Sequence, residues 1–504
     1  MKTLKYSLIA VLALAGSACT NLDEQIKDNF TDKVPDYDIG KGTNVNKAVP
    51  NDGLNAAFAR VLNGTANHGS YFSVQEISSD EAVITQKGGD WFDGGIWLVT
   101  HKHEFSSIQG GINGAWNDIY GGIVQCNTIL AATGTTVAQA AQLRTLRAYL
   151  YWRLLDLFGN VPITTQPGVA APQATRAQVY AFVESELLAA LPNLPEGKQE
   201  YGRVSKGAAN ALLARLYLNA SVYKGSPEWQ KAIDAADAVI NSGVYSLSSD
   251  YAKVFSPDNV ENVEHIFVAP FDESTGTGMN FAQMTLHYPS QLTYRLQEQP
   301  WNGYSTLEAF YNSYEATDKR RANNFIVGPQ KDIDGNPILD LAFDKEDPDG
   351  PEINYTPKIN MLAPNGSRQA GARLGKFSFK RGQAQHMDND YPLLRYGEVL
   401  LNKAEAVARL NNNFSHPTTL TLVNQLRKRA GVSDFTSLTE GGMLAERGRE
   451  LFQEALRRTD LIRFGAWGGA WWEKPAHNNT FKNLMPIPSE QLVANQSLKQ
   501  NPGY

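Results

Sequence analysis

The sequence predicts a mainly α-helical protein built from paired helices, together with a second part that is rich in loops and short strands. The helical part is indicated by apolar residues at steps of three and four in residues 139–158 and in later alanine-rich stretches, because that spacing places them on one helix face. The loop-rich part is indicated by residues 64–109 and 248–390, which lack a sustained helical period. With 504 residues, the chain is long enough to bury a large core.

The strongest helix prediction covers residues 139–158. Leucines between positions 143 and 157 stack on one face, and Tyr151 and Trp152 widen that face beyond what one partner helix could cover. Gly159 follows as a C-terminal cap. Because so wide an apolar arc has to be covered on more than one side, we expect other helices to pack against this one.

Several further helices are predicted along the chain. They cover residues 110–132, 175–191, 205–222, 229–240, 394–410, 417–430 and 438–458, with short helices at about 52–62 and 305–315 and a short turn at 489–494 in a mostly irregular tail. Asp334 and Gly335 indicate a hairpin turn in the loop-rich part. The pair 205–222 and 229–240 resembles a tetratricopeptide repeat, a unit of about 34 residues. We therefore expect one body over residues 51–504, with helical repeats at about 110–243 and 392–460 and loop-rich insertions at about 64–109 and 248–390.

The first residues form a targeting segment. Lys2 and Lys5 precede an apolar run that is too short to span a bilayer, and small residues lead to Cys19. Two interpretations cut the same bond after Ala18: ordinary secretion, or lipoprotein processing in which Cys19 receives the lipid. We expect a signal peptide at residues 1–18 and, in the second case, a lipid-anchored polar tether at residues 19–50.

Composition narrows the classes of function. The net charge of −6 at pH 7 argues against a nucleic-acid-binding protein, which would carry a basic surface. Cys126 lies in a predicted apolar helix and is expected to be a small buried side chain; if Cys19 is lipidated, no disulfide can form within one chain. No later apolar run is long enough for a transmembrane helix, so we expect any membrane attachment to use a lipid.

Acidic side chains at a four-residue spacing allow two interpretations. Glu446, Glu450 and Glu454 could supply the carboxylate pair of a glycosidase, or they could form ion pairs with arginines of neighbouring helices. Glycosidase carboxylates flank the scissile bond, whereas side chains four residues apart on a helix project the same way. The spacing therefore favours structural ion pairs. The same interpretation applies to Arg395, Glu398 and Glu405.

Metal ligands are scarce in the sequence. His101 and His103 alternate as on a β-strand and so face one side, but no cysteine pair or HExxH pattern supplies further ligands. An acidic turn with Asp344, Asp347 and Asp349 lacks the spacing of an EF-hand, which favours a solvated loop over a calcium site. We therefore expect no metal site and no cofactor.

Two aromatic clusters in the loop-rich part supply the candidate ligand-binding residues. Trp91 and Trp97 lie among glycines that leave little bulk to bury their rings, and Trp301 lies in the second cluster. Flat rings match the apolar C–H face of a pyranose, while Asp and Asn match its rim of hydroxyl groups. The alternative is that each tryptophan plugs its loop onto the helices. The candidate glycan-binding residues are Asp90, Trp91, Trp97, Trp301, Asn302 and Tyr304.

Five stretches share their order along the chain with the motifs of a known family. They are residues 147–162 (RAYLYWRLLDLFGNVP), 201–218 (YGRVSKGAANALLARLYL), 394–406 (LRYGEVLLNKAEA), 446–463 (ERGRELFQEALRRTDLIR), and the ending with 485–488 (MPIP) and 500–504 (QNPGY). On these motifs the chain resembles the SusD/RagB family of outer-membrane glycan-binding lipoproteins of Bacteroidetes. The resemblance covers essentially the whole chain after the targeting segment.

The resemblance implies non-catalytic capture of an oligosaccharide at the cell surface and its delivery to a SusC-like TonB-dependent outer-membrane transporter. It also implies a lipid on Cys19 that holds the protein on the outer membrane, facing the cell exterior. In the family the glycan site is an arc of aromatic loop residues on the face away from the repeats, and Trp91, Trp97 and Trp301 fall in the corresponding stretches. Two alternatives stay open: an extracellular glycoside hydrolase, and a helical-repeat scaffold that binds only protein.

Overall fold

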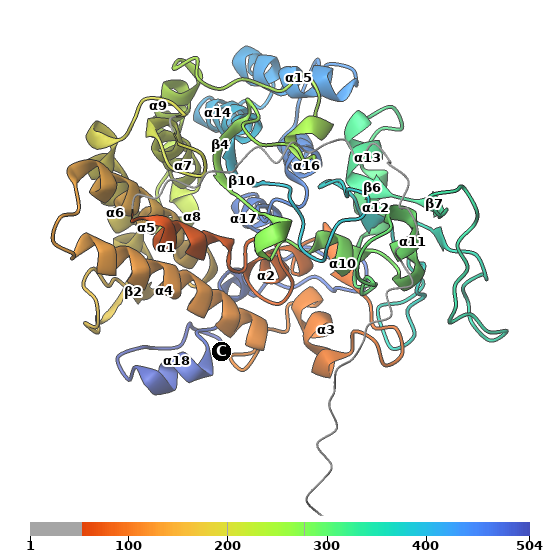
Figure 1. The fold of residues 1–504 in the computed structure, drawn as a ribbon. Helices are drawn as coiled ribbons and strands as arrows, with labels where there is room; N and C mark the ends of the chain where they lie inside the picture. Colours follow the sequence, from red (N-terminus) through yellow and green to blue (C-terminus); the bar gives the residue numbers. More distant parts are fainter. Residues whose placement is uncertain (1–52, 199, 277) are drawn as a thin grey trace, which may run out of the picture. The chain divides into compact units, whose positions relative to one another are not determined.

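A computed structural model describes residues 53–198, 200–276 and 278–504, and Figure 1 shows the fold. The predicted signal peptide, Cys19 and the tether at residues 19–50 lie outside the described residues. Those that are described belong to one of two compact units of the chain, Gly42–Tyr504. None of the described helices is both long and apolar enough to cross a membrane.

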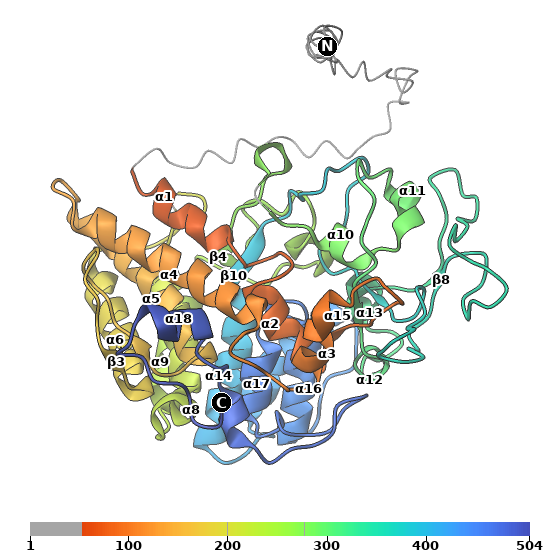
Figure 2. The same cartoon turned by 90° about the horizontal axis from the view of Figure 1, so that it is seen from below.

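The long helices pack against one another in neighbouring pairs (Figures 1 and 2). They are α4 (Gly110–Leu130), α5 (Val137–Leu157), α6 (Arg176–Ala190), α7 (Lys206–Leu218), α9 (Trp229–Ile240), α14 (Tyr396–Leu410) and α15 (Pro417–Ala430). Helix α5 lies between α4 and α6, α7 packs against α9, and α14 contacts α7, α9 and α15. The predicted mainly helical architecture of paired helices is confirmed.

Helix α5 lies where the sequence predicts it. Thr136 caps its start through a capping box with Gln139, and Gly159, at φ +71°, follows its end in the left-handed conformation. Tyr151 is buried between Tyr120 of α4 and Phe182 of α6, and the buried Trp152 ring lies against the guanidinium group of Arg215 on α7. The wide apolar face is therefore covered from more than one side, as expected.

Shorter helices fill the connections. They are α1 (Asn55–Phe58), α2 (Tyr71–Ile77), α3 (Ile96–His101), α8 (Ala220–Lys224), α10 (Phe281–Thr285), α11 (Gln291–Tyr294), α12 (Glu308–Asn312), α13 (Lys319–Asn324), α16 (Glu440–Leu451), α17 (Arg457–Arg463) and α18 (Ser489–Ala494). Helix α12 matches the short helix predicted near 305–315, and helix α18 lies where the sequence predicts a short turn at residues 489–494. Helices α2, α3, α10, α11 and α13 lie in segments predicted to lack helical structure, because none of them is long enough to show a period in the sequence.

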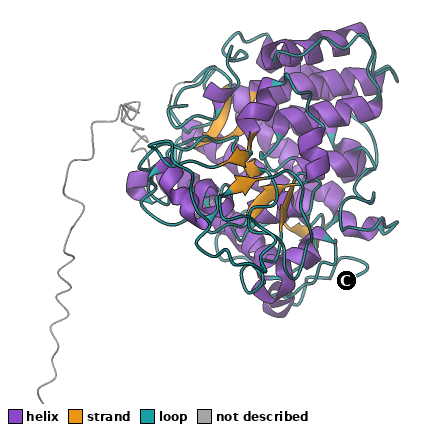
Figure 3. Cartoon of the chain, turned by 90° about the vertical axis from the view of Figure 1, so that its right-hand side faces the viewer, coloured by secondary structure: helices purple, strands orange, loops and turns teal. Residues whose placement is uncertain are grey.

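The strands pair in antiparallel fashion, and Figure 3 shows them as short pieces among loops. The pairs are β1 (Ala82–Ile84) with β5 (Tyr304–Thr306), β2 (Val161–Pro162) with β3 (Gln173–Ala174), β4 (His265–Ala269) with β10 (Tyr391–Arg395), β6 (Phe325–Ile326) with β9 (Arg373–Leu374), and β7 (Gly328–Pro329) with β8 (Asn354–Tyr355). The β1–β5 pair joins the two loop-rich segments, with Ile84 opposite Tyr304. The predicted hairpin is also present, since Lys331 pairs with Pro337 around Gly335.

The prediction of one continuous helix over residues 438–458 is wrong, because residues 452–456 are not helical. Helix α16 ends at Leu451, and α17 begins after a turn in which Gln453 and Ala455 have positive φ. Two buried carboxylates accept the backbone N–H groups of this turn: Glu81 that of Gln453 at 3.3 Å, and Glu76 that of Ala455 at 2.7 Å. These contacts with a distant part of the chain replace helical hydrogen bonds. They cannot be predicted from the spacing of apolar residues.

Two other predicted helices have different boundaries. Leu394 and Arg395 belong to strand β10, so α14 begins at Tyr396. The helix predicted at residues 205–222 is divided at Asn219 into α7 and α8. Cys126 on α4 is fully buried, as the sequence predicts.

The glutamates of α16 form buried ion pairs with arginines, as predicted. Glu446 lies 2.8 Å from Arg320, and Glu450 lies 2.8 Å from Arg395. Burial by itself raises the pKa of Glu446, but Arg320 and neighbouring arginines outweigh it and hold the pKa at about 2. The further pairs are Glu454–Arg395, Arg458–Asp156, Arg215–Glu398 and Arg463–Glu405. These enclosed side chains join elements of the core and do not face a substrate cleft.

Candidate functional site

The two aromatic clusters meet in the structure, because strands β1 and β5 hold their loops side by side. The indole N–H of Trp91 donates to the carbonyl oxygen of Trp301 at 2.6 Å, across 210 positions of sequence. Both side chains are half-buried, so each keeps part of its surface in solvent. Trp91 and Trp301 therefore meet at one site, while their contact with a glycan stays a prediction. Helices α3, α10 and α11, which flank this region, lie away from α6 and α9 (Figures 1 and 2).

The absence of a side chain at Gly303 allows the Trp91 ring to pack against the backbone. A Cβ atom at Gly303 would lie only 2.3 Å from Cζ2 of Trp91, so the ring lies directly against the backbone there. The ammonium group of Lys87 donates to the carbonyl oxygens of Thr85 at 3.1 Å and Gly303 at 3.4 Å, which ties the first loop to the second. Trp91 itself has φ +59°, an uncommon conformation for a bulky residue that the surrounding contacts hold.

His68 lies at the centre of the aromatic cluster. Its ring centroid is 5.1 Å from that of Trp91, 4.9 Å from Trp97 and 6.1 Å from Trp301. Its Nδ1 atom lies 3.3 Å from the hydroxyl oxygen of Tyr304. Burial lowers the pKa of His68 despite the opposing charge of Asp93, which favours the neutral ring at pH 7. Nothing in the sequence marks His68, since a lone histidine in a glycine-rich loop has no periodic or motif signal.

Trp97 occupies a different position from the one expected of an exposed loop residue. It lies on helix α3 and is only 5% exposed. Its indole N–H donates to Oδ2 of Asp93 at 2.6 Å, and its ring centroid is 6.1 Å from that of Trp91. Trp97 therefore supports the cluster from within and presents little surface of its own.

Asn302 and Tyr304 lie beneath the rings. Both are fully buried, and the Tyr304 hydroxyl lies 2.6 Å from Oγ of Ser73. Tyr304 is held in strand β5, so its ring forms the floor on which His68 packs. In this structure the two residues support the site from below, and direct contact with a ligand stays a prediction for them.

Two cavities adjoin the cluster. The first, of about 340 Å³, is open to solvent and is here named the Trp301 cavity; it is lined by Asp90, Trp91, Tyr288, Gln299, Pro300 and Trp301. The second, of about 290 Å³, is named the Trp97 cavity, and its lining includes His68, Asp93, Ile96, Trp97 and Thr100. The Tyr288 hydroxyl donates to Asp90, which holds that carboxylate at the first cavity. Each cavity thus combines a tryptophan with one exposed aspartate.

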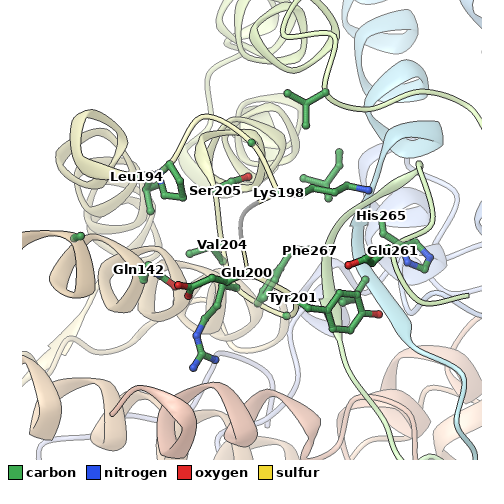
Figure 4. Close-up of a pocket in the computed structure, with 18 of the residues that line it drawn as sticks. Gln142, Leu194, Lys198, Glu200, Tyr201, Val204, Ser205, Glu261, His265 and Phe267 are labelled. Atoms are coloured by element: carbon green, nitrogen blue, oxygen red, sulfur yellow. The ribbon is translucent and has the colours of Figure 1, made fainter. Parts of the chain in front are cut away.

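A larger cavity, of about 750 Å³, lies elsewhere, between the segment before α7 and strand β4 (Figure 4). Lys198, Tyr201, His265 and Phe267 are among its lining residues. None of the residues predicted to bind a glycan lines it. Volume does not decide the site. The arrangement of partly exposed indole rings beside a carboxylate does, and that arrangement is found at the Trp301 cavity.

The prediction that His101 and His103 alternate on a strand is wrong. His101 ends helix α3, and His103 follows with φ +58°. His101 contacts the carbonyl oxygen of Trp472 at 2.8 Å, and His103 lies 3.0 Å from His477. Burial lowers the pKa of His101 to about 4, so it is neutral at pH 7 and fastens the C-terminal segment to α3.

No metal-binding group was found in the described part of the chain, where no set of three or more His, Cys, Asp or Glu residues is arranged to hold an ion. In the acidic turn, Asp347 pairs with Arg368, and Asp349 accepts the backbone N–H of Arg368 at 2.7 Å. These carboxylates are therefore engaged by an arginine.

Comparison with known proteins defines the class. A model of the SusD family matches residues 263–504, and a second family model, described as "Starch-binding associating with outer membrane", matches residues 54–218. The starch-binding protein SusD of Bacteroides thetaiotaomicron is 30% identical over 413 residues, which is 73% of each chain. A SusD-like protein of Bacteroides ovatus is 23% identical over 494 residues, covering 91% of this chain and 82% of the relative. The chain belongs to the SusD family.

Solved structures show the same fold. A laminarin-binding SusD-like protein superposes with a TM-score of 0.71 at 22% identity, over 90% of this chain and 98% of that one. Surface glycan-binding protein A from Bacteroides thetaiotaomicron, solved with laminarihexaose, gives a TM-score of 0.69 at 21% identity, over 89% and 98% of the two chains. At these identities the likeness concerns the fold.

Proposed function

We propose that this protein binds oligosaccharides at the cell surface through the Trp301 cavity. The observation that carries the proposal is the meeting of two half-exposed indole rings, Trp91 and Trp301, beside the Asp90 carboxylate in an open cavity. Membership of the SusD family, with a starch-binding relative at 30% identity, supports a glycan as the ligand.

The chemistry of the cavity suits a sugar. An indole ring covers the C–H face of a pyranose, and each such aromatic anchor contributes about 1–3 kcal/mol. Asp90 and Gln299 are exposed at the rim and accept or donate hydrogen bonds to hydroxyl groups. Because Trp91 is fixed by Gly303 and by its bond to Trp301, the ring loses little freedom when a ligand arrives.

The protein binds its glycan without cleaving it. The glutamates at four-residue spacing, Glu446, Glu450 and Glu454, are buried among arginines and do not reach either aromatic cavity. Glycoside hydrolysis requires two carboxyl groups about 5–9 Å apart on either side of the scissile bond, and the Trp301 cavity is lined by one, that of Asp90.

The anchor and the partner complete the proposal. Cys19 carries a lipid that holds the protein on the outer membrane, and the bound oligosaccharide passes to a SusC-like TonB-dependent transporter. The family model described as associating with the outer membrane supports this location.

Calorimetry tests the proposal. The full-length protein is titrated with maltoheptaose and laminarihexaose, and the same ligands are incubated with it and assayed for new reducing ends. We expect binding and no new reducing ends. Cleavage would favour the glycoside hydrolase alternative, and failure to bind any member of a broad glycan array would favour the protein-binding scaffold.

A further inference from the structure

We infer that the site selects neutral glycans and rejects anionic ones such as uronate-containing or sulfated chains. The inference rests on the proposed function and names the class of glycan bound. It is carried by the placement of acidic and basic side chains around the two aromatic cavities.

One carboxylate is presented at each cavity. Asp90 lines the Trp301 cavity and Asp93 lines the Trp97 cavity, and both side chains are exposed. Tyr288 donates to Oδ2 of Asp90, and the indole N–H of Trp97 donates to Oδ2 of Asp93. Each aspartate is thereby held in one orientation, with oxygen lone pairs left for hydroxyl donors of a ligand.

No basic side chain balances these charges at the site. Among the described residues that line either cavity there is no lysine and no arginine. Lys87 lies behind the first loop, but it is buried and donates to the carbonyl oxygens of Thr85 and Gly303. Burial lowers the pKa of Lys87, and the Asp90 carboxylate opposes this shift.

Two other basic groups lie in the adjoining loops, outside the linings of both cavities. Arg368 forms ion pairs with Asp340, at 3.1 Å, and with Asp347. Arg373 is fully buried and donates to the backbone carbonyl of Arg368. Neither guanidinium group lines an aromatic cavity.

The two cavities are separated by packed aromatic rings. The ring centroids of Trp91 and Trp97 are 6.1 Å apart, and His68 packs against both. A chain that covers both cavities therefore meets Asp90 with one part and Asp93 with another. Like charges a few ångströms apart near a protein surface repel enough to weaken binding by about tenfold. A neutral hydroxyl group instead donates a charge-assisted hydrogen bond to the same carboxylate.

The experiment compares matched neutral and anionic ligands. The full-length protein is titrated calorimetrically with maltoheptaose and laminarihexaose, and with the same two oligosaccharides oxidised at C6 to uronates. The measurement is repeated at low and high NaCl, and with the double variant Asp90→Asn/Asp93→Asn. Asparagine keeps an oxygen that accepts from Tyr288 or Trp97, so the geometry of the site is retained.

We expect the oxidised ligands to bind at least about tenfold more weakly than their neutral parents at low salt. High salt and the double variant should each reduce this difference to about threefold or less, because screening and neutralisation both remove the repulsion. Equal or tighter binding of the oxidised ligands would overturn the inference and leave glycan binding intact. A salt-independent difference would also overturn it, even if the double variant failed to fold. If none of the four ligands binds, a neutral oligosaccharide found on the glycan array and its C6-oxidised form replace them, and the same outcomes decide the inference.

Discussion

Replacing Gly303 by alanine should weaken glycan binding while leaving the fold intact. The new Cβ atom would lie 2.3 Å from Cζ2 of Trp91, whereas ordinary carbon contacts begin near 3.4 Å, so the ring has to move by about 1 Å. Gly303 does not have a positive φ, so alanine is compatible with its backbone. The substitution therefore acts mainly on the ring.

The cost follows from what the ring loses. A shift of this size breaks the 2.6 Å hydrogen bond from Trp91 to the Trp301 carbonyl, which contributes about 0.5–1.5 kcal/mol. It also tilts an aromatic anchor that contributes about 1–3 kcal/mol to binding. We expect a loss of about 1–3 kcal/mol in binding free energy, or about fivefold to a hundredfold in Kd.

Calorimetry and thermal melting of Gly303→Ala measure the two effects separately. Gly89→Ala is the matched control, because it lies in the Trp91 loop without a positive φ and a Cβ there meets no atom within 4 Å. The control should bind as the parent protein does. If Gly303→Ala bound its glycan with unchanged affinity, Trp91 would not be a ligand contact and the reasoning would be refuted.

Further predictions concern the anchor, the core and pH. Cys19→Ala should release the protein from the membrane fraction, and retention in cells that also lack the partner transporter would contradict the lipid anchor. Glu450→Gln should destabilise the fold by about 3–5 kcal/mol in denaturant unfolding, because it leaves buried arginines without their counter-charge; loss of a glycan-cleaving activity in this variant would instead reveal catalysis. Burial raises the pKa of Glu76 from 4.5 to about 7. Between pH 4.5 and pH 7, the native state therefore keeps a proton on Glu76 that the unfolded state has released. The contribution of Glu76 to the unfolding free energy should therefore fall as pH rises from 4.5 to 7, by at most about 3 kcal/mol, and Glu76→Gln should remove this contribution from the pH profile. An identical pH profile in the variant would contradict the assignment.

The helical side of the fold could be predicted from the sequence because its signals are local. The apolar face of α5 and its C-terminal cap at Gly159 are set by residues that are close together in the sequence. Helices α4, α6, α9 and α15 could be predicted from the same kind of local pattern. The turn at Gln453 and Ala455 could not be predicted, because carboxylates from the distant α2–β1 region fix it. Where a long-range contact determines the backbone conformation, apolar periodicity does not predict it.

The candidate site was predictable in part. Trp91 and Trp301 could be expected to meet because one flat ring covers one sugar face, and several rings in an arc are needed to select a curved oligosaccharide. His68 lies at their centre and Gly303 lies against the Trp91 ring because strands β1 and β5 pair. Strands of three residues are too short for this pairing to be predicted from the sequence. Trp97 lies on helix α3 and is buried there. This burial could not be predicted, because a helix of six residues is too short to show a period.

The most direct test of the central claim is calorimetry of the double variant Trp91→Ala/Trp301→Ala with the best-binding neutral oligosaccharide. Trp97→Ala is measured beside it, since Trp97 is buried and its loss should lower thermal stability more than the double variant does. We predict that the double variant loses measurable binding while its circular dichroism spectrum is unchanged, because the two rings lie on loops outside the paired helices. Normal binding by the double variant, accompanied only by a lower melting temperature, would show that these tryptophans are plugs of the core and that the glycan binds elsewhere.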